Sequence, residues 1–435
     1  MELKLELKLT QDLSETYKKS LANLSELQEQ SKDEETKGLT WFNWPEQGGF
    51  DLLSEIQEKK DSLAFYYDLI VVVGIGGSYL GAKAINDLFG VDLTQESQQK
   101  KRKPILFIGN NLSENYLLKN LTLIKQHSPV FCVVSKSGTT VEPLAAYSLL
   151  EEQMTSYFSK EELAERTFII TDQKENNPLL NKSKEEKTHL IHIPKEMGGR
   201  FSVLSAASLV PLALAGHKVK SLMQGSQRFF QELNSPQDKK LAVAEYASAR
   251  FLTWEQGKRI ELLAYNEPSL GGLASWWQQL FAESEGKKAK GLFPTTSLYS
   301  TDLHSLGQYL QEGCPSIFET FLLYEDHSPL GLEEAETRLR IPSNLKARAL
   351  LGDKCGHYFF DLNQKIMTAA QKAHEKNDIP YCKITLPKLT EMNLGYLLSF
   401  FQTACALSAM LLEVNPFDQP GVEIYKRELQ QLTMS

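Results

Sequence analysis

Residues 68–78 read DLIVVVGIGGS, an apolar and β-branched run that stops at a cluster of glycines. A run of this kind is typical of a strand that is buried on both faces. Glycines directly after the strand let the backbone approach a ligand closely, and the helix that follows offers free N–H groups. This stretch therefore predicts a strand–loop–helix unit of a parallel sheet, with a ligand site at the loop.

The same pattern recurs along the chain. Four more short apolar runs in the first half predict strands, at ILFIGN (105–110), PVFCVVS (129–135), TFIITD (167–172) and HLIHIP (189–194). The second half predicts strands at RIELLAY (259–265), IFETFLLY (317–324) and YCKITLP (381–387), and helices at 270–283 and 394–412. Strands that alternate with helices predict parallel sheets covered on both faces.

The length of 435 residues suits two sizeable domains better than one core. The first forty or so residues predict an amphipathic surface helix, followed by a loop at TWFNWPEQ, and the charged stretch 224–240 is the predicted junction. We therefore expect an N-terminal helical segment at 1–45, a first α/β domain at 46–225 and a second at 240–410, followed by a C-terminal segment at 411–435.

The composition is that of an ordinary soluble protein, with 42% hydrophobic and 23% charged residues. The net charge of −8 argues against a nucleic-acid partner, which would favour a basic face. The apolar segment 394–412 contains the polar residues Ser399, Gln402, Thr403 and Ser408, so a core helix is expected there and not a membrane span. The start of the chain has no secretory h-region, and the five cysteines form no Cys-x-x-Cys pair, which predicts a cytoplasmic protein.

Residues 135–140 read SKSGTT and follow the strand PVFCVV. Four hydroxyl groups and one lysine at a predicted helix start suit a phosphate monoester, whose oxygens accept several hydrogen bonds. The alternative is a Ser/Thr-rich helix N-cap without a ligand. The glycine loop after another strand favours phosphate, because ligands of open α/β sheets bind beyond the carboxyl ends of strands.

A nucleotide is disfavoured at the glycine loop. The dinucleotide fingerprint requires a glycine where Tyr79 stands, and the next strand ends in asparagines instead of an acidic residue. Gly76 and Gly81 have the Walker spacing, but Ala82 stands where lysine is required.

Six segments follow one another from about residue 70 to the end of the chain: GIGGSYLG, SKSGTTVE, GGRFSVLS, ESEGK, STDLHSLGQ and FDQPGVEIYK. Together they resemble the phosphoglucose isomerase family, bacterial type. The resemblance implies two sugar-isomerase (SIS) domains, each a doubly wound, mainly parallel sheet flanked by helices, with a C-terminal helical arm. It also implies a cytoplasmic homodimer that interconverts glucose 6-phosphate and fructose 6-phosphate in glycolysis and gluconeogenesis, without a metal or an organic cofactor.

The resemblance also implies roles for single residues. Glu283 of ESEGK matches the base that moves a proton between C1 and C2, and Arg200 of GGRFS matches the cation near the cis-enediolate. His304 and Lys426 match the pair that assists ring opening, and His304 is implied to reach into the partner's site. The residues implied to bind the substrate are Gly77, Ser78, Ser135, Lys136, Ser137, Thr139, Thr140, Gln279 and Gln419. One departure from some members is Ser137-Gly138 in place of Thr-Phe, which preserves the number of hydroxyl groups.

The reaction requires these residue types. A histidine and a lysine suit ring opening near neutral pH, and one carboxylate can move the proton because C1 and C2 are adjacent in a planar enediolate. The charge that develops on the enediolate needs a fixed cation. The phosphate supplies binding energy that positions the reacting carbons.

Each residue taken singly also has a plainer interpretation. Glu283 could be a solvated helix end, His304 a loop residue that caps a helix, and Arg200 or Lys426 a surface cation. A sugar-phosphate sensor of the same fold, which binds without turnover, is a second hypothesis, but it leaves the joint presence of these four residues unexplained. A nucleotide-dependent enzyme is a third hypothesis, and both incomplete glycine motifs argue against it.

Overall fold

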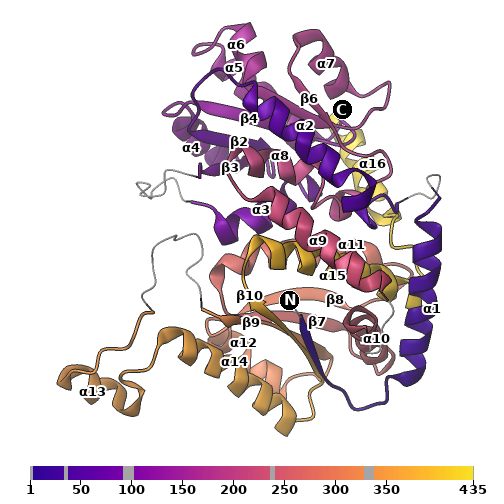
Figure 1. The fold of residues 1–435 in the computed structure, drawn as a ribbon, viewed down its shortest axis with the longest axis vertical. Coiled ribbons are helices and arrows are strands. Elements are labelled where there is room, and N and C mark those ends of the chain that lie inside the picture. Colours follow the sequence, from indigo (N-terminus) through magenta and orange to yellow (C-terminus); the bar gives the residue numbers. More distant parts are fainter. Residues whose placement is uncertain (1–2, 34–37, 92–101, 236–240, 328–337, 435) are drawn as a thin grey trace. The chain divides into compact units, whose positions relative to one another are not determined.

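The computed structural model describes residues 3–33, 38–91, 102–235, 241–327 and 338–434. The chain divides into two units (Figure 1). Unit 1 comprises Met1–Glu29, Pro236–Leu389 and Phe400–Ser435, and unit 2 comprises Gln30–Ser235 and Thr390–Ser399. Each unit contains a five-stranded sheet flanked by helices, which confirms the predicted fold class of two mainly parallel α/β sheets.

The sheet of unit 2 is wholly parallel, in the order β3-β2-β4-β5-β6. Its strands are β2 (Leu69–Val73), β3 (Ile105–Ile108), β4 (Pro129–Val134), β5 (Thr167–Thr171) and β6 (His189–His192). The other elements are η1 (Pro45–Gly49), α2 (Phe50–Asp61), α3 (Gly77–Phe89), α4 (Glu114–Ile124), α5 (Val141–Met154), α6 (Lys160–Glu165), α7 (Pro178–Glu186), η2 (Gly199–Phe201), α8 (Ala206–Leu214) and α9 (Val219–Asn234). All five predicted strands of the first half are therefore confirmed.

Strand β2 lies between two packed layers, and all its residues are fully buried. Leu69, Val71 and Val73 form one cluster with the buried faces of α4 and α5. Helix α8 also contacts β2, and α8 packs against α3 (Figure 1). The chain winds from β2 to β3 on one side and from β4 onward on the other. The point where the winding reverses, between β2 and β4, is where open α/β sheets bind ligands.

Unit 1 repeats this winding. Its sheet has the order β1-β10-β9-β7-β8, and β1 alone is antiparallel to its neighbour. The strands are β1 (Lys4–Lys8), β7 (Ile260–Tyr265), β8 (Phe293–Leu298), β9 (Ile317–Asp326) and β10 (Tyr381–Lys388). The other elements are α1 (Ser14–Gln30, whose last residue is assigned to unit 2), α10 (Ala242–Glu255), η3 (Pro268–Leu270), α11 (Gly271–Glu285), α12 (Leu303–Glu312), α13 (Leu345–Leu351), η4 (Gly352–Lys354), α14 (Phe359–Lys376), α15 (Glu391–Leu411, whose first residues belong to unit 2) and α16 (Pro420–Met434).

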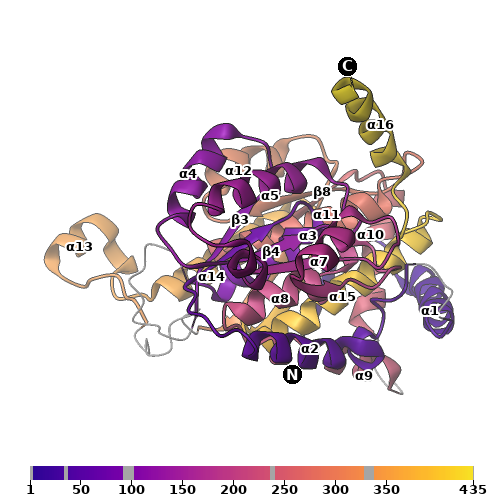
Figure 2. The same ribbon diagram turned by 90° about the horizontal axis from the view of Figure 1, so that it is seen from above.

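Both faces of the unit 1 sheet are covered by helices. On one face, Leu262 and Phe321 pack with residues of α12 and α14. On the other face, buried aromatic residues of α10, α11 and α15 contact one another, including Tyr246, Phe281 and Phe401. Helix α13 extends away from the rest of unit 1 (Figures 1 and 2).

One sequence prediction is wrong in detail. The N-terminal segment does not begin as a helix, because residues 4–8 form the edge strand β1, whose side chains alternate between exposed and half-buried as the alternating sequence KLELK requires. The predicted junction 224–240 contains the point where the chain passes from unit 2 to unit 1, after Ser235, and its first part, as far as Asn234, is the end of α9, which buries Phe229 and Phe230. Residues 236–240 lie outside the described part of the chain.

The units do not coincide with the predicted domain ranges. The chain passes from unit 2 to unit 1 after Ser235. The N-terminal residues, as far as Glu29, belong to unit 1, and residues 390–399 belong to unit 2. The limits 1–45, 46–225, 240–410 and 411–435 stay a prediction.

Helix α15 is the one described helix that is long and apolar enough to cross a membrane, and 89% of its most apolar stretch is buried inside the structure. This burial agrees with the core helix expected at 394–412. Its Ser399 hydroxyl donates to the Ser226 hydroxyl of α9 at 2.7 Å in unit 2, and its Cys405 packs against the Leu280 carbonyl of α11 in unit 1.

Candidate functional site

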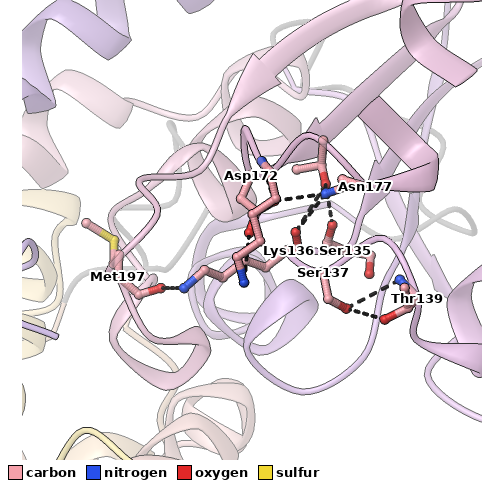
Figure 3. Close-up of polar contacts among 9 residues, drawn as sticks. Ser135, Lys136, Ser137, Thr139, Asp172, Asn177 and Met197 are labelled. Atoms are coloured by element: carbon pink, nitrogen blue, oxygen red, sulfur yellow. Dashed lines mark hydrogen bonds and ion pairs between the residues drawn. The ribbon is translucent and has the colours of Figure 1, made fainter. Parts of the chain in front are cut away.

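The SKSGTT loop follows the carboxyl end of β4, on the ligand side of the winding reversal in unit 2 (Figure 3). Ser135 is buried, and its Oγ finds no hydrogen-bond partner among the described residues. Ser137 and Thr139 are exposed, and the Thr139 hydroxyl donates to Ser137 Oγ at 2.9 Å. Thr140 is the N-cap residue of α5, so the loop ends where a helix presents its unpaired N–H groups.

Asn177 fixes the shape of this loop from the start of α7 (Figure 3). Its Nδ2 donates to the Lys136 carbonyl at 3.0 Å, and the Thr171 hydroxyl donates to the Ser135 carbonyl at 2.7 Å. Gly138 has a φ of +65°, and a Cβ there would lie 1.9 Å from Asn177 Oδ1. The left-handed backbone and this close approach explain why glycine occupies position 138.

Lys136 is turned toward the GGRFS segment, since its Nζ donates to the Met197 carbonyl at 3.0 Å (Figure 3). Burial lowers the pKa of Lys136 from its ordinary value of 10.5, while the carboxylates of Glu196 and Asp172 oppose that shift. The ammonium group is therefore a partly desolvated cation at the loop. Such a group attracts an anion more strongly than an exposed lysine does.

The glycine loop meets the GGRFS segment directly. A Cβ on Gly77 would lie 2.0 Å from the Gly199 carbonyl oxygen, so only glycine allows the two backbones to touch. Ser78 is half-buried in the first turn of α3. Arg200 follows Gly199 in η2 and is 2% exposed, with its guanidinium 5.6 Å from the Phe201 ring centroid. A plain surface role for Arg200 is therefore excluded.

The predicted loop TWFNWPEQ packs against the GGRFS segment and the residues that follow it. The sequence did not indicate this contact. The Trp41 ring stacks on the Phe201 ring with 4.9 Å between centroids, and Trp44 Nε1 donates to the Leu204 carbonyl at 3.0 Å. Unit 2 thus brings together the glycine loop, the SKSGTT loop and Arg200 at the carboxyl ends of its central strands.

In unit 1, Glu283 lies near the end of α11 and is half-buried. Gln279, one helical turn earlier, donates from Nε2 to Glu283 Oε1 at 2.9 Å. The Gln279 Oε1 atom is buried and has no hydrogen-bond partner in the described part of the chain. The carboxylate of Glu283 is therefore held in a defined orientation and is not a freely moving helix end.

The second glutamate of ESEGK has a different environment. Glu285 is 1% exposed and is paired with Arg250 of α10, which also binds Glu261 of β7 at 2.6 Å. Burial raises the pKa of Glu285, and Arg250 opposes that shift. This buried network fixes the end of α11 and was not predicted, because its members are far apart in the sequence.

His304 lies in the first turn of α12, beyond the carboxyl end of β8, and its side chain is exposed. Glu283 lies toward the opposite, amino-terminal end of the same strand, since Gln278 of α11 donates to the Pro294 carbonyl at the start of β8. Strand β8 has six residues, which span about 20 Å. The structure does not bring His304 and Glu283 of one chain together.

Gln419 and Lys426 belong to the C-terminal segment of unit 1. Gln419 is half-buried just before α16, and Lys426 is exposed on that helix, where its Nζ donates to Glu423 Oε1 at 2.8 Å. Asp418, next to Gln419, is paired with Lys287 at 2.9 Å. The segment that contains Gln419 is thereby tied to the end of the helix that contains Glu283.

No group of three or more His, Cys, Asp or Glu side chains in the described ranges could hold a metal ion.

The comparisons with known proteins agree on one family. Residues 65–313 match the family described as phosphoglucose isomerase. The chain is 37% identical over 419 residues to the glucose-6-phosphate isomerase of the Aster yellows witches'-broom phytoplasma, covering 96% of this chain and 94% of that protein. Its fold resembles a crystal structure of a hypothetical protein from Thermus thermophilus, with a TM-score of 0.86, 25% identity and complete coverage of both chains. It also resembles a glucose-6-phosphate isomerase from Chlamydia trachomatis, with a TM-score of 0.77, 19% identity, and coverage of 99% of this chain and 88% of that one.

Proposed function

The chain belongs to the phosphoglucose isomerase family and interconverts glucose 6-phosphate and fructose 6-phosphate, and from this premise we propose which residues perform the reaction. The SKSGTT loop and the glycine loop bind the phosphosugar, Glu283 moves the proton, Arg200 stabilises the enediolate, and Lys426 with His304 opens the ring. The observation that carries the proposal is the convergence of the SKSGTT loop, Gly77 and Arg200 at the winding reversal of unit 2.

The chemistry needs one base for two positions. Glu283 removes the proton from C2 of the aldose, giving a planar cis-enediolate, and returns it to C1, giving the ketose. The hydrogen bond from Gln279 orients the carboxylate for this transfer. Arg200 is a suitable counter-charge because its guanidinium is buried, and electrostatic interactions are stronger where water is excluded.

Phosphate binding is assigned to hydroxyl and ammonium groups of one short loop. Ser135, Ser137, Thr139 and Thr140 supply hydroxyl groups, and Lys136 supplies the cation. The loop is held by Asn177 and Thr171, so little conformational freedom is lost when the ligand binds. Gln279 and Gln419 are proposed as amide contacts to the sugar.

Replacing Lys136 with glutamine tests the phosphate assignment. Loss of a charged hydrogen bond is expected to raise KM for fructose 6-phosphate by about 10- to 100-fold. Lys174→Gln is the matched control, because Lys174 is 62% exposed in its side chain and pairs with Asp172 at 3.9 Å. An unchanged KM in Lys136→Gln, or an equal rise in both variants, would exclude the assigned role.

The pH dependence provides a second measurement on the same lysine. Only protonated Lys136 binds a phosphate dianion well, and burial lowers its pKa below the ordinary 10.5. The pH dependence of kcat/KM reports the ionisation of groups in the free enzyme. We therefore expect kcat/KM to fall as Lys136 loses its proton, and this fall to begin at a lower pH than it would if Lys136 were an exposed lysine. This alkaline fall should be absent from the residual activity of Lys136→Gln; a fall that persists unchanged would have another cause.

We further propose that the protein is a cytoplasmic homodimer in which His304 acts in the partner's site. Within one chain His304 and Glu283 lie toward opposite ends of strand β8 in unit 1, as the Gln278–Pro294 contact indicates. The α12 surface beside His304 exposes Leu306 and Tyr309, by 40% and 49%, and an interface between protomers would cover such apolar side chains.

Mixed dimers of His304→Ala and Glu283→Gln test the sharing of sites. If His304 serves the partner, each mixed dimer contains one intact site, and random reassociation restores about one quarter of the wild-type activity. If His304 serves its own chain, every site lacks one residue and the mixture stays inactive. Each variant alone, refolded in the same way, is the control.

A further inference from the structure

Lys287 connects two parts of unit 1 that the proposed function uses. It is the second residue after α11, and its side chain is only 10% exposed. Its Nζ donates to the Ser284 carbonyl at 3.0 Å and to the Asn415 carbonyl, and it forms an ion pair with Asp418 Oδ1 at 2.9 Å. One ammonium group thus binds both the end of the helix with Glu283 and the segment 415–418.

The segment held by Lys287 leads directly to Gln419 and then to α16, which contains Lys426. Every residue from Pro420 to Glu428 is exposed, so this stretch of α16 buries little surface of its own. A helix with a small buried face depends on its anchored end for its position. The anchored end of α16 is the segment that Lys287 binds.

We propose that Lys287 is a positioning residue for ring opening, which holds the C-terminal segment so that Gln419 and Lys426 reach the substrate. The inference rests on the proposed function of Lys426. Lys287 does not touch the reacting atoms in this scheme. Its three contacts set the register between α11 and the segment 415–419, and small errors in such a register are costly because a displacement of about 1 Å can slow a reaction by about 10²-fold.

Lys287→Met removes the charge and keeps most of the side-chain length. We expect kcat to fall by about 10- to 100-fold and KM for fructose 6-phosphate to rise by a smaller factor, because Gln419 is displaced while the SKSGTT loop is unaltered. Asp418→Asn removes the charge of a half-exposed carboxylate and leaves Lys287 in place, so it should fold normally and reduce kcat by a smaller factor.

Lys290→Met is the matched control. Lys290 lies in the same loop, and its Nζ likewise binds the chain after α15, at the Leu412 carbonyl (2.8 Å) and Glu413 (3.5 Å). These contacts precede the segment 415–419, so kcat should stay within a few-fold of wild type. An equal loss of kcat in Lys287→Met and Lys290→Met would show that the loop matters only for general stability, and would overturn the inference.

The double variant Lys287→Met/Lys426→Met separates positioning from general damage. If Lys287 acts through Lys426, the double variant should be about as slow as Lys426→Met alone, because residues that act as a unit are not additive. If the fold-loss of kcat in the double variant equals the product of the losses in the two single variants, the inference is contradicted. If Lys426→Met keeps full activity, the proposed role of Lys426 is wrong. If Lys426→Met loses activity but Lys287→Met keeps it, the role of Lys426 stands and only the positioning inference is wrong.

Discussion

Glu283→Gln is expected to reduce kcat for conversion of fructose 6-phosphate to glucose 6-phosphate by about 10²- to 10⁴-fold, which is the usual contribution of general acid–base catalysis. Glutamine has nearly the same shape and can keep a hydrogen bond with Gln279, so the substrate should still bind. What the variant loses is the ability to accept a proton, from C1 of fructose 6-phosphate in this direction and from C2 of glucose 6-phosphate in the reverse direction. Initial rates, measured with excess chelator, give kcat, and exchange of the C1 proton of fructose 6-phosphate with deuterated water should be lost in parallel.

Glu285→Gln is the control, because it makes the same chemical change two residues away in ESEGK. Glu285 is buried against Arg250, so its replacement should lower the free energy of unfolding and leave kcat within a few-fold of wild type. The assignment fails if Glu283→Gln turns over at the wild-type rate. It also fails if folded Glu285→Gln loses as much kcat as Glu283→Gln.

Central strands could be predicted from the sequence because burial on both faces demands an uninterrupted apolar run. Strand β2 is such a run, and the structure places it within one residue of the prediction. Strand β8 at the sheet edge was not predicted, because FPTTSL contains a proline and two threonines and is only partly buried. Edge strands such as β1 need only one apolar face, so their pattern is weaker.

Helix α9 shows a different limit. Its charged residues suggested only a junction between domains, whereas its apolar residues, among them Leu222, Met223 and Leu233, lie on one buried face of a helix. Composition hides a face of this kind, and only the periodicity of the apolar residues indicates it.

The proposed site residues lie in motifs that the sequence displays, whereas the residues that support them could not be predicted. Asn177, Trp41 and Lys287 each act through contacts with residues that are distant in the sequence or in another segment. Asn177 had one local signal, since Asn followed by Pro is typical of a helix start. Nothing local indicates that its amide binds the SKSGTT loop, because that contact exists only in the folded sheet.

Arg250→Met is expected to lower the free energy of unfolding by about 3–5 kcal/mol, the usual cost of breaking a buried ion pair. The side chains of Arg250 and Glu261 are 0% exposed and that of Glu285 is 1% exposed. Glu261 also accepts hydrogen bonds from the hydroxyl groups of Tyr246 and Thr320, both at 2.7 Å. Removing the guanidinium leaves two carboxylates in the core without a counter-charge, although methionine fills most of the volume.

The sign of the pH dependence distinguishes this mechanism from a simple loss of packing. Burial already raises the pKa of Glu285, and the loss of Arg250, which opposes that shift, should raise it further. A carboxyl with a raised pKa in the folded state favours folding when protonated, and that contribution is lost as the pH rises through the folded pKa. Arg250→Met should therefore recover stability relative to wild type as the pH falls from 7 toward 5, which urea unfolding at both values can measure.

Replacing the carboxylates as well gives the matching control. The triple variant Arg250→Met/Glu261→Gln/Glu285→Gln contains no buried charge at this site, so it should be more stable than Arg250→Met at pH 7 and much less sensitive to pH. The loss of unfolding free energy in Arg250→Met could instead be independent of pH and equally large in the triple variant. That result would indicate that methionine leaves a cavity or fits poorly, and that uncompensated charge is not the cause. The network would then stabilise the end of α11 by shape, and Glu283 would owe its position to packing alone.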